Sequence, residues 1–264
     1  MVKKLKRKAI VICLLIIITL SICVFVYPFI YANKCKNKFY PEINDMITED
    51  LKNSCVSFMW SDHQDAVTSY NIGSSGVIIK KEENKYYVAT ANHVVSDKEE
   101  LRVYPYASLS YRDYIKEFGT VSYSDYFNGF PSLKIEYQNV DDDIAIVSFE
   151  SENNYPVVSY NNDFNKRDKI FSIGCPNGEL FTVTFGEIVD PNEMLYMFAD
   201  NKKTNCIKHN CYVAKGSSGS PVFNENMELI GINIGGKTIC GQFSCGYFVK
   251  INKVIENLWY IKMD

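Results

Sequence analysis

A serine held among glycines and small residues is the first feature of this sequence that could do chemistry. Ser218 lies in the stretch AKGSSGSPVFN, residues 214–224, whose composition alone is typical of a flexible linker. Apolar, strand-like segments flank this stretch on both sides, and a flexible linker would not lie between them. Gly216 lets the backbone turn sharply, so the N–H groups of Gly216 and Ser218 could stabilise an oxyanion. Ser218 is therefore a candidate nucleophile rather than part of a spacer.

A serine nucleophile needs a base within hydrogen-bond reach and a third group that orients the base. The chain has three histidines, His63, His93 and His209, and none of them follows Ser218. This excludes the Ser…Asp…His order of α/β-hydrolases, whose G-x-S-x-G motif also fails because residue 220 is serine. The order that remains is histidine, then aspartate, then serine.

His93 and Asp143 fill the first two places of that order. His93 follows an apolar run in YYVATANHVV, which puts its imidazole at the end of a buried strand. Asp143 is the last of three acids in VDDDIAIVSFE and adjoins a buried-looking strand, whereas Asp141 and Asp142 fit a solvated turn. Taken alone, His93 fits a structural core histidine better than a catalytic one. The argument for catalysis rests on the ordered set.

The elements that must position these residues are predicted to be β-strands. From Cys55 onward, short β-branched or aromatic runs, YPVVSY and NCYVA among them, are mostly separated by Gly, Asn, Asp or Pro. This cadence predicts an all-β barrel or sandwich. Residues 101–140 are tyrosine-rich and irregular, which indicates a long surface loop. A C-terminal amphipathic helix over about 251–262 is predicted by apolar residues at helical spacing, namely Ile251, Val254, Ile255, Leu258 and Ile261.

Three motifs in order, TANHVV, DIAIV and GSSGSPVFN, resemble the catalytic motifs of trypsin-like (chymotrypsin-fold) serine proteases over about residues 55–255. IGCPNG followed by FTVTFGEIV is similar to a stretch of HtrA/Deg proteases, and GSSGSPVFNENMELIGINIGG resembles the nucleophile region of glutamyl endopeptidases. The resemblance implies His93 as general base, Asp143 as the acid that orients it and Ser218 as nucleophile. It also implies two six-stranded antiparallel β-barrels, about 54–152 and about 155–250, with the triad between them.

The sequence departs from these families at several positions. Ser217 precedes the nucleophile where the family usually has Asp or Asn, but this side chain is not part of the chemistry. Asn233 follows Ile232 where glutamyl endopeptidases carry a histidine, so glutamate specificity is not expected. The HtrA resemblance would add a PDZ domain, and none is expected in the few residues after the last predicted strand. We expect the substrate pocket to include Tyr212, Lys215, Asn233 and Gly235.

The N-terminus predicts a membrane anchor. Five basic residues within the first eight precede an uncharged run, residues 9–33, which as a helix would be about 37 Å long. A bilayer core is about 30 Å thick. This predicts a cytoplasmic segment 1–8, a transmembrane signal-anchor helix 9–32, a stalk 33–53 and an extracytoplasmic protease domain 54–264. The alternative is a cleaved signal peptide and a secreted domain, although Ile30-Tyr31-Ala32 is a poor cleavage site.

Seven cysteines lie beyond the predicted anchor, namely Cys35, Cys55, Cys175, Cys206, Cys211, Cys240 and Cys245. An oxidising compartment favours disulfides over zinc for their two Cys-x4-Cys spacings. The resemblance suggests a bridge between the 206/211 loop and the 240/245 loop, and the alternative is two local pairs, 206–211 and 240–245. Cys35–Cys55 would be a third pair, which leaves Cys175 as a buried free thiol. His209 is expected on a surface loop, with a substrate contact as the alternative.

Other classes of function fit the sequence less well. Without the five basic residues of segment 1–8, 23 basic residues oppose 31 acidic ones, a net charge of about −8, and no basic stripe suits nucleic acid. Residues 231–238, GINIGGKT, match the P-loop pattern, but a turn and a strand follow instead of a helix, so no nucleotide binding is expected.

The prediction is therefore a membrane-anchored serine endopeptidase that acts on protein or peptide substrates through an acyl-enzyme, without metal or organic cofactor. The alternative is a protease-like domain that binds or senses without turnover. A purely structural surface protein would leave the ordered triad as a coincidence.

Overall fold

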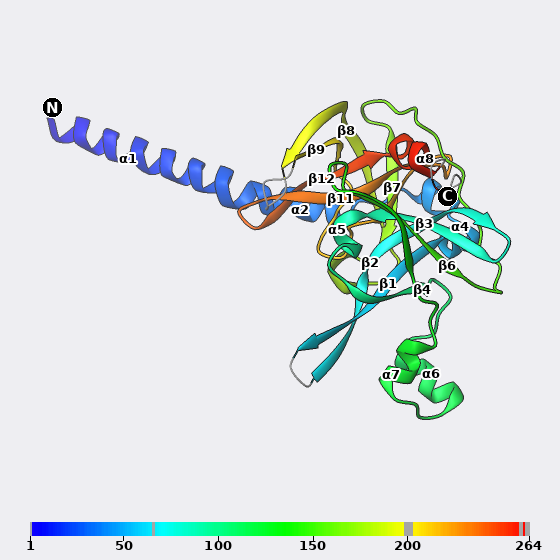
Figure 1. Ribbon diagram of the computed structural model, residues 1–264. Helices are drawn as coiled ribbons and strands as arrows, with labels where there is room; N and C mark the ends of the chain where they lie inside the picture. Colours follow the sequence, from blue (N-terminus) through cyan, green and yellow to red (C-terminus); the bar gives the residue numbers. More distant parts are fainter. Residues whose placement is uncertain (1, 65–66, 198–202, 259–260, 262–264) are drawn as a thin grey trace.

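The computed structural model describes residues 2–64, 67–197, 203–258 and 261, and its central feature is a pair of six-stranded antiparallel sheets (Figure 1). The first sheet has the order β4-β1-β2-β3-β6-β5 and the second β10-β11-β12-β9-β8-β7. The strands of the first sheet are β1 (Cys55–Gln64), β2 (Val67–Glu82), β3 (Lys85–Ala91), β4 (Glu99–Pro105), β5 (Lys134–Asn139) and β6 (Ile144–Glu150). Those of the second are β7 (Lys169–Gly174), β8 (Thr182–Met197), β9 (Lys203–His209), β10 (Pro221–Asn224), β11 (Leu229–Ile239) and β12 (Gln242–Lys250).

The edges of the two sheets are joined in different ways. In the second sheet, β10 pairs with β7 and closes a barrel. In the first sheet, the edge strand β4 meets the residues just before β5. Val103 N–H donates to the Pro131 carbonyl at 3.0 Å, and Leu133 N–H donates to the Leu101 carbonyl at 2.9 Å. The prediction of two six-stranded antiparallel barrels is therefore confirmed in part, because both sheets have six antiparallel strands and the second is a closed barrel.

The centre of the first sheet is formed by β3 and β6, whose sequences are almost continuous apolar runs. Residues 86–91 of β3 and 144–149 of β6 are all buried. Their antiparallel register places Ala91 opposite Ile144, so that the end of β3 lies beside the start of β6. This register brings together the two turns that carry His93 and Asp143.

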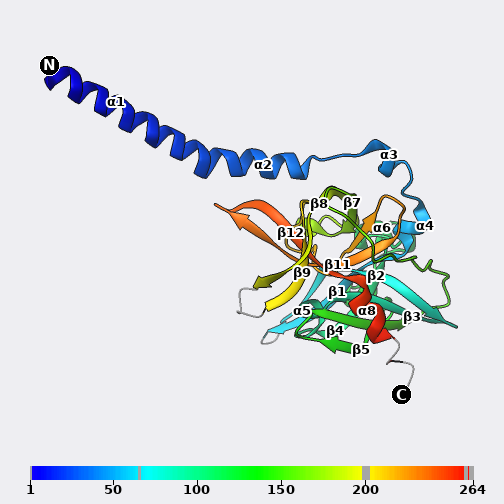
Figure 2. The same cartoon turned by 90° about the horizontal axis from the view of Figure 1, so that it is seen from above.

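The predicted C-terminal helix is confirmed as α8 (Ile251–Leu258). Its apolar face buries Ile251 and Val254. The helix contacts β11 and β12 of the second sheet and β6 of the first (Figure 2). It therefore helps to hold the two sheets together.

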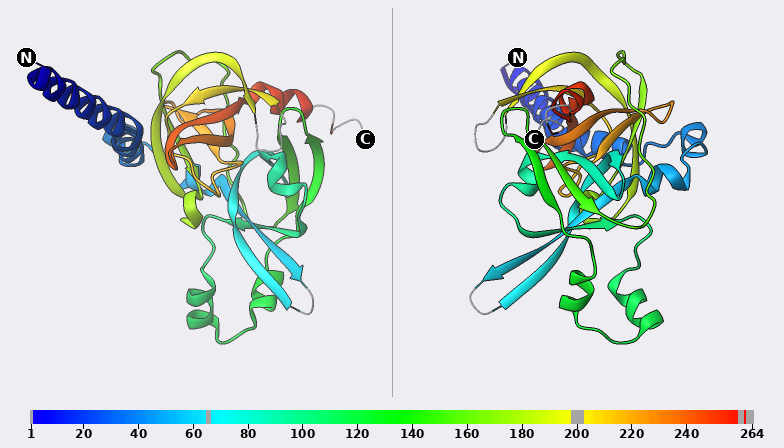
Figure 3. Two further views of the ribbon diagram at one scale, coloured as in Figure 1. Left: turned by 90° about the vertical axis from the view of Figure 1, so that its left-hand side faces the viewer. Right: turned by 45° about the vertical axis from the view of Figure 1, so that its right-hand side comes forward.

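Residues 101–140, predicted to include a long surface loop and a strand at 132–138, contain β4, two short helices and β5. The helices α6 (Tyr111–Phe118) and α7 (Tyr123–Asn128) each begin at a serine whose side chain accepts a backbone N–H, which is a strong helix-start signal. They project from the same side of the first sheet as the β1–β2 hairpin (Figures 1 and 3). Aromatic packing holds them there, with the rings of Tyr70 and Tyr123 5.5 Å apart.

Two predicted strands are wrong. YPVVSY, residues 155–160, contributes only an isolated bridge from Tyr160 to Leu229, and NCYVA, residues 210–214, forms an irregular loop after His209, at the end of β9. Both segments contain β-formers, but their backbones find no continuous partner strand. Strand formation depends on such a partner more than on intrinsic propensity.

The predicted transmembrane helix at 9–32 is corrected. The uncharged run is divided among α1 (Val2–Ser21), the π-helix η1 (Ile22–Val26) and α2 (Tyr27–Lys36), and α1 includes the basic residues near its start. Among the helices in the described part of the chain, none has the length and apolar character that a membrane crossing requires.

The predicted stalk, 33–53, lies against the second barrel. It includes the end of α2, α3 (Pro41–Asn44) and α4 (Glu49–Asn53). Ile43 is buried, and Glu187 of β8 accepts hydrogen bonds from Lys38 Nζ at 2.6 Å and Tyr40 OH at 2.7 Å. These contacts attach the segment to the folded domain.

The predicted disulfides are absent among the cysteines whose side chains are described. The free thiols are Cys13, Cys35, Cys55, Cys175, Cys206, Cys211, Cys240 and Cys245, and the side chain of Cys23 lies outside the described residues. Cys206 and Cys245 lie in the same buried cluster, but each thiol has another partner. The Cys206 thiol contacts the Met194 carbonyl at 3.4 Å, whereas the Cys245 thiol contacts the Tyr247 hydroxyl at 3.3 Å. Cys240 is exposed, and Cys175 is a buried free thiol as predicted.

Candidate active site

His93 and Asp143 come together because the strands that carry them are paired. His93 lies in the first turn of α5 (Asn92–Val95), directly after β3, and Asp143 directly precedes β6. Asn92 N–H donates to the Asp143 carbonyl at 3.0 Å. Asp143 has a φ of 50°, in the left-handed region that aspartate tolerates better than most residues.

The Asp143 carboxylate binds His93 at two points. It accepts the His93 backbone N–H at 2.9 Å through Oδ1 and lies 2.7 Å from His93 Nδ1 through Oδ2. The Asp143 side chain is 7% exposed, whereas that of His93 is 44% exposed. A carboxylate at Nδ1 favours the neutral tautomer with the proton on Nδ1, in which Nε2 carries the lone pair.

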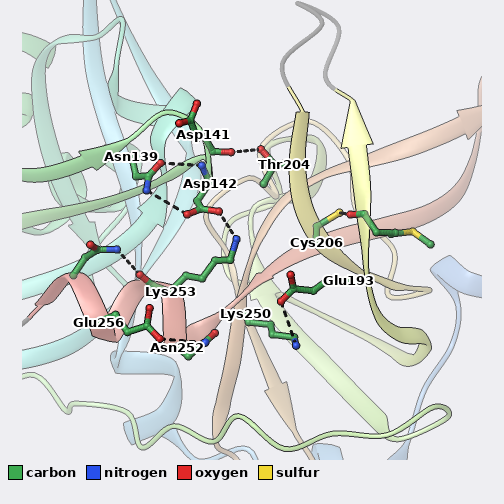
Figure 4. A network of polar contacts seen from close by, with 12 residues as sticks. Asn139, Asp141, Asp142, Glu193, Thr204, Cys206, Lys250, Asn252, Lys253 and Glu256 are labelled. Carbon is green, nitrogen blue, oxygen red and sulfur yellow. Dashed lines mark hydrogen bonds and ion pairs between the residues drawn. The ribbon is translucent and has the colours of Figure 1, made fainter.

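The turn that carries Asp143 is tied to the second barrel and to α8 (Figure 4). Thr204 Oγ1 on β9 donates to the Asp141 carbonyl at 2.7 Å. Lys253 Nζ on α8 forms an ion pair with the Asp142 carboxylate. The Asp141 side chain is exposed, as expected of a solvated turn, but Asp142 is held by this ion pair.

The loop that carries Ser218 needs glycine at two positions. Gly216 and Gly219 have φ values of 96° and 82°. A Cβ at Gly216 would lie 2.1 Å from the Cys175 carbonyl oxygen, and one at Gly219 would lie 2.0 Å from that of Ser75. The close approach also lets Ser75 N–H donate to the Ser218 carbonyl at 3.0 Å, which links the first sheet to the loop.

The carbonyl groups of this loop determine where its N–H groups point. The Lys215 carbonyl accepts the Asn177 N–H at 2.8 Å, and the Ser217 carbonyl accepts the Ser220 N–H at 3.1 Å. In a trans peptide the next N–H points the opposite way. The N–H groups of Gly216 and Ser218 therefore point away from these partners, and neither has an acceptor among the residues that the structure describes.

A cavity of about 270 Å³ opens beside Ser218. Lys215, Asn233 and Gly235, three of the four predicted pocket residues, line it. Tyr212, the fourth, is not among its lining residues. Its ring lies 5.3 Å from that of Phe243.

The sequence did not indicate three further residues of the wall of this cavity. Val213, Gly236 and Phe243 line the same cavity. A Cβ on Gly236 would lie 2.6 Å from the Val213 side chain, so these two positions pack closely.

Asn233 holds the nucleophile loop through both its side chain and its backbone. Its side-chain Nδ2 donates to Ser172 Oγ at 3.0 Å and to Ser220 Oγ at 2.9 Å, and its carbonyl accepts the Gly219 N–H at 2.8 Å. Asn233 is 1% exposed. Asn233 therefore lines the cavity and also helps to fix the conformation of the loop.

The other two histidines do not join this constellation. His209, expected on a surface loop, is fully buried on β9, with its ring against Gly246, where a Cβ would come within 2.3 Å of it. Burial lowers the pKa of His209 to about 3, so the ring is neutral at ordinary pH. The side chain of His63 lies outside the described residues.

The sequence reasoning missed Ser75 and Asn177, which hold the nucleophile loop from outside it. Ser75 belongs to a GSSG stretch, residues 73–76, that repeats the letters of residues 216–219. Asn177 precedes a glycine in a tight turn and has a φ of 56°. The repeated GSSG and the Asn-Gly pair indicated unusual backbone conformations, but only the fold shows that Ser75 and Asn177 contact the nucleophile loop.

Comparison with known proteins agrees with this arrangement. Residues 74–232 match the trypsin-like peptidase domain, a range that includes His93, Asp143 and Ser218. The Do-like serine protease HtrB of Bacillus subtilis is 28% identical over 186 residues, which are 68% of this chain and 36% of that protein. A probable periplasmic DegP-like serine endoprotease of Rickettsia conorii is 32% identical over 105 residues, 39% of this chain and 21% of that protein.

The fold has a counterpart among solved structures. The HtrA-type protease AlgW, solved as a serine-to-alanine variant with a tripeptide, superposes with a TM-score of 0.61 at 18% identity, over 80% of this chain and 60% of that one. The present chain spans only about a third of the HtrB relative's length. The domain match nevertheless covers more than half of the present chain, and the chain belongs to the trypsin-like peptidase family, with HtrA-type proteases as its homologues.

Proposed function

We propose that this chain is a serine endopeptidase that cleaves peptide bonds through an acyl-enzyme. The observation that carries the proposal is the 2.7 Å contact between His93 Nδ1 and the buried Asp143 carboxylate, made beside a loop that presents Ser218 on a cavity wall. Family membership adds to it, since trypsin-like peptidases hydrolyse peptide bonds with such a constellation.

In the proposed reaction, Ser218 Oγ attacks the substrate carbonyl carbon while His93 Nε2 takes the hydroxyl proton. Asp143 stabilises the imidazolium that forms. The Gly216 and Ser218 N–H groups stabilise the negative charge that develops on the carbonyl oxygen. His93 then gives its proton to the leaving amine. A water molecule next attacks the acyl carbon while His93 takes its proton, and His93 returns that proton to Ser218 Oγ as the acid product leaves.

We further propose that the cavity binds an apolar side chain of the substrate residue before the cleaved bond. Val213 and Phe243 provide apolar side chains to its wall, and Gly235 and Gly236 add no side chain of their own. The cations Lys215 and Lys237 are exposed and so lie at its rim. The tripeptide in the AlgW structure supports peptides as the ligand class.

An extracytoplasmic location is part of the same proposal. It is supported by the DegP-like relative of Rickettsia conorii, whose name places it in the periplasm.

The proposal predicts that a fluorophosphonate probe modifies Ser218 of the full chain. Peptide mass spectrometry locates the adduct. Ser218→Ala and His93→Ala should each reduce labelling by at least about 10³-fold, because the nucleophile and its base act as a unit. Ser124→Ala, on the distant helix α7, is the matched serine control and should label like the parent.

Failure to label would contradict the proposal, provided that circular dichroism shows the parent protein to be folded. The result would then favour a protease-like domain that binds peptides without turnover. Labelling that persists in His93→Ala would contradict the assignment of His93 as base.

A further inference from the structure

The N-terminal helix α2 lies against the wall of the cavity at Ser218. Ala32 and Cys35 of α2 form one buried cluster with Val213 and Phe243, and both of the latter line that cavity. Ala32 is 7% exposed and Phe243 6% exposed. The helix contacts β12, which carries Phe243, and lies beside the second barrel (Figure 2).

Phe243 lies between two cavities and packs against this helix. Its side chain lines the cavity at Ser218 on one side and a second cavity of about 200 Å³ on the other. Tyr27, Pro28 and Tyr31 of α2 bound the second cavity. Phe243 packs on Tyr212 and Val213 of the second barrel, and α2 adds contacts to the same buried side chain, so a displacement of α2 would change its position.

The loop that leads to Ser218 also contacts α2. The ring of Tyr212 packs against Phe243 and lies beneath Lys36 Nζ, 5.8 Å from its centroid. The Tyr212 hydroxyl accepts a hydrogen bond from Asn177 Nδ2 at 3.3 Å. Tyr212 therefore connects α2 to the turn whose backbone holds the Lys215 carbonyl.

The C-terminal end of α2 is fixed to the barrel by polar contacts. The Lys38 ammonium and the Tyr40 hydroxyl both bind Glu187 on β8. The hydrogen bonds from Lys38 and Tyr40 outweigh burial and lower the pKa of Glu187, so its carboxylate is ionised at neutral pH. The helix is thus held both by its apolar face and by an ion pair.

We propose that α2 is the outer wall of the specificity pocket and that Ala32 is its positioning residue. Ala32 does not touch the substrate. It holds Val213 and Phe243 at the distance that decides which apolar side chain fits. The proposal deepens the proposed function and rests on it, because it assigns the cavity at Ser218 to the substrate side chain.

The test compares Ala32→Asp with Asn33→Asp in the full chain. Asn33→Asp is the matched control, since it places the same carboxylate one residue further along, on the exposed face of α2. Ala32→Asp puts a charge into the apolar cluster and should displace the helix. We expect the ratio of kcat/KM for substrates with Phe and with Val before the cleaved bond to change by about tenfold, mainly through KM.

Two readouts separate this effect from a general loss of structure. Fluorophosphonate labelling of Ser218 should be largely retained in Ala32→Asp, because Ser75 holds the nucleophile loop through the Ser218 and Gly216 carbonyls independently of Ala32. Ala32→Ser, which keeps the size of the side chain, should retain the parent ratio. A variant that loses activity equally for both substrates would overturn the proposal.

Binding measurements keep the test independent of turnover. In the Ser218→Ala background, calorimetry with peptides ending in Phe or Val gives the ratio of their Kd values. This ratio should shift with Ala32→Asp by about the same factor as the kinetic one. An unshifted Kd ratio would overturn the role of α2, whereas an unlabelled and inactive parent would overturn only the proposed function.

Discussion

At the scale of single residues, two buried ionisable side chains differ in role, Asp143 inside the site and His209 outside it. Asp143 is almost fully buried and has a cationic partner only when His93 is protonated, which suits an acid that stabilises an imidazolium. His209 is the opposite case, a base kept neutral by complete burial next to Gly246.

Replacement of His209 by leucine should flatten the pH dependence of stability below pH 6.5. Above that pH, His209 is neutral in both the folded and the unfolded chain. Between about pH 6.5 and the folded pKa of about 3, only the unfolded chain binds the proton, so stability falls as the pH falls. The free energy of unfolding decreases by about 1.4 kcal/mol per pH unit, and this decrease ends once the pH falls below the folded pKa of His209.

Urea unfolding of the parent and of His209→Leu at pH 7, 6 and 5 measures this slope. The chosen window lies mostly above the titration of unfolded carboxyl groups. The difference in slope between the two proteins isolates His209 from groups that both share. Equal slopes would show that His209 is protonated inside the folded protein or is reached by water.

At the scale of elements, the acid turn is positioned by parts of the chain far from it in sequence. Residues 140–143 belong to the first sheet, but Thr204 of β9 and Lys253 of α8 hold them (Figure 4). A C-terminal helix that contacts both sheets is well placed to keep Asp143 in register with His93.

Lys253→Met should therefore lower kcat and leave KM nearly unchanged. Loss of the ion pair with Asp142 lets the turn move and lengthens the contact between Asp143 and His93. We expect a loss smaller than the roughly 10²-fold that a displacement of 1 Å can cause. Steady-state kinetics on a peptide substrate measures the split between kcat and KM.

Lys250→Met is the control for this prediction. Lys250 also forms an ion pair, with Glu193 at 3.3 Å, but that pair does not touch the 140–143 turn (Figure 4). Its substitution should leave kcat within about twofold of the parent, as for most single ion pairs near a surface. A similar loss in both variants would mean that α8 acts only through general stability.

At the scale of the whole molecule, the site exists only because two sheets meet. The first sheet provides His93, Asp143 and Ser75, and the second provides the loop with Ser218. Ser75 binds this loop twice, through its N–H to the Ser218 carbonyl and through Oγ to the Gly216 carbonyl at 3.2 Å. Any relative movement of the sheets would change the nucleophile loop.

Ser75→Ala removes the side-chain contact and keeps the backbone one. A single hydrogen bond contributes about 0.5–1.5 kcal/mol, so kcat should fall by up to about tenfold. Ser69→Ala, on the same strand but in an exposed contact at 3.4 Å with the Asp62 carbonyl, should have no effect. Parent-like activity of Ser75→Ala would show that the backbone contact alone fixes the loop.

The sequence by itself determined the features that depend on residue type and local order. The three-motif order of His93, Asp143 and Ser218 predicted a family that the domain match confirms. Short β-branched and aromatic runs predicted an all-β fold, the family resemblance implied two six-stranded barrels, and helical spacing predicted α8. Such patterns are local, because strand and helix periodicity repeat within a few residues.

Only the tertiary structure decided which distant residues touch. The helices α6 and α7 were missed because aromatic packing between separate segments stabilises them. The described cysteines form none of the predicted disulfides, and cysteine spacing by itself does not fix which thiols meet in the fold. The packing of α2 on the cavity wall and the burial of His209 likewise depend on contacts between residues that no sequence period relates.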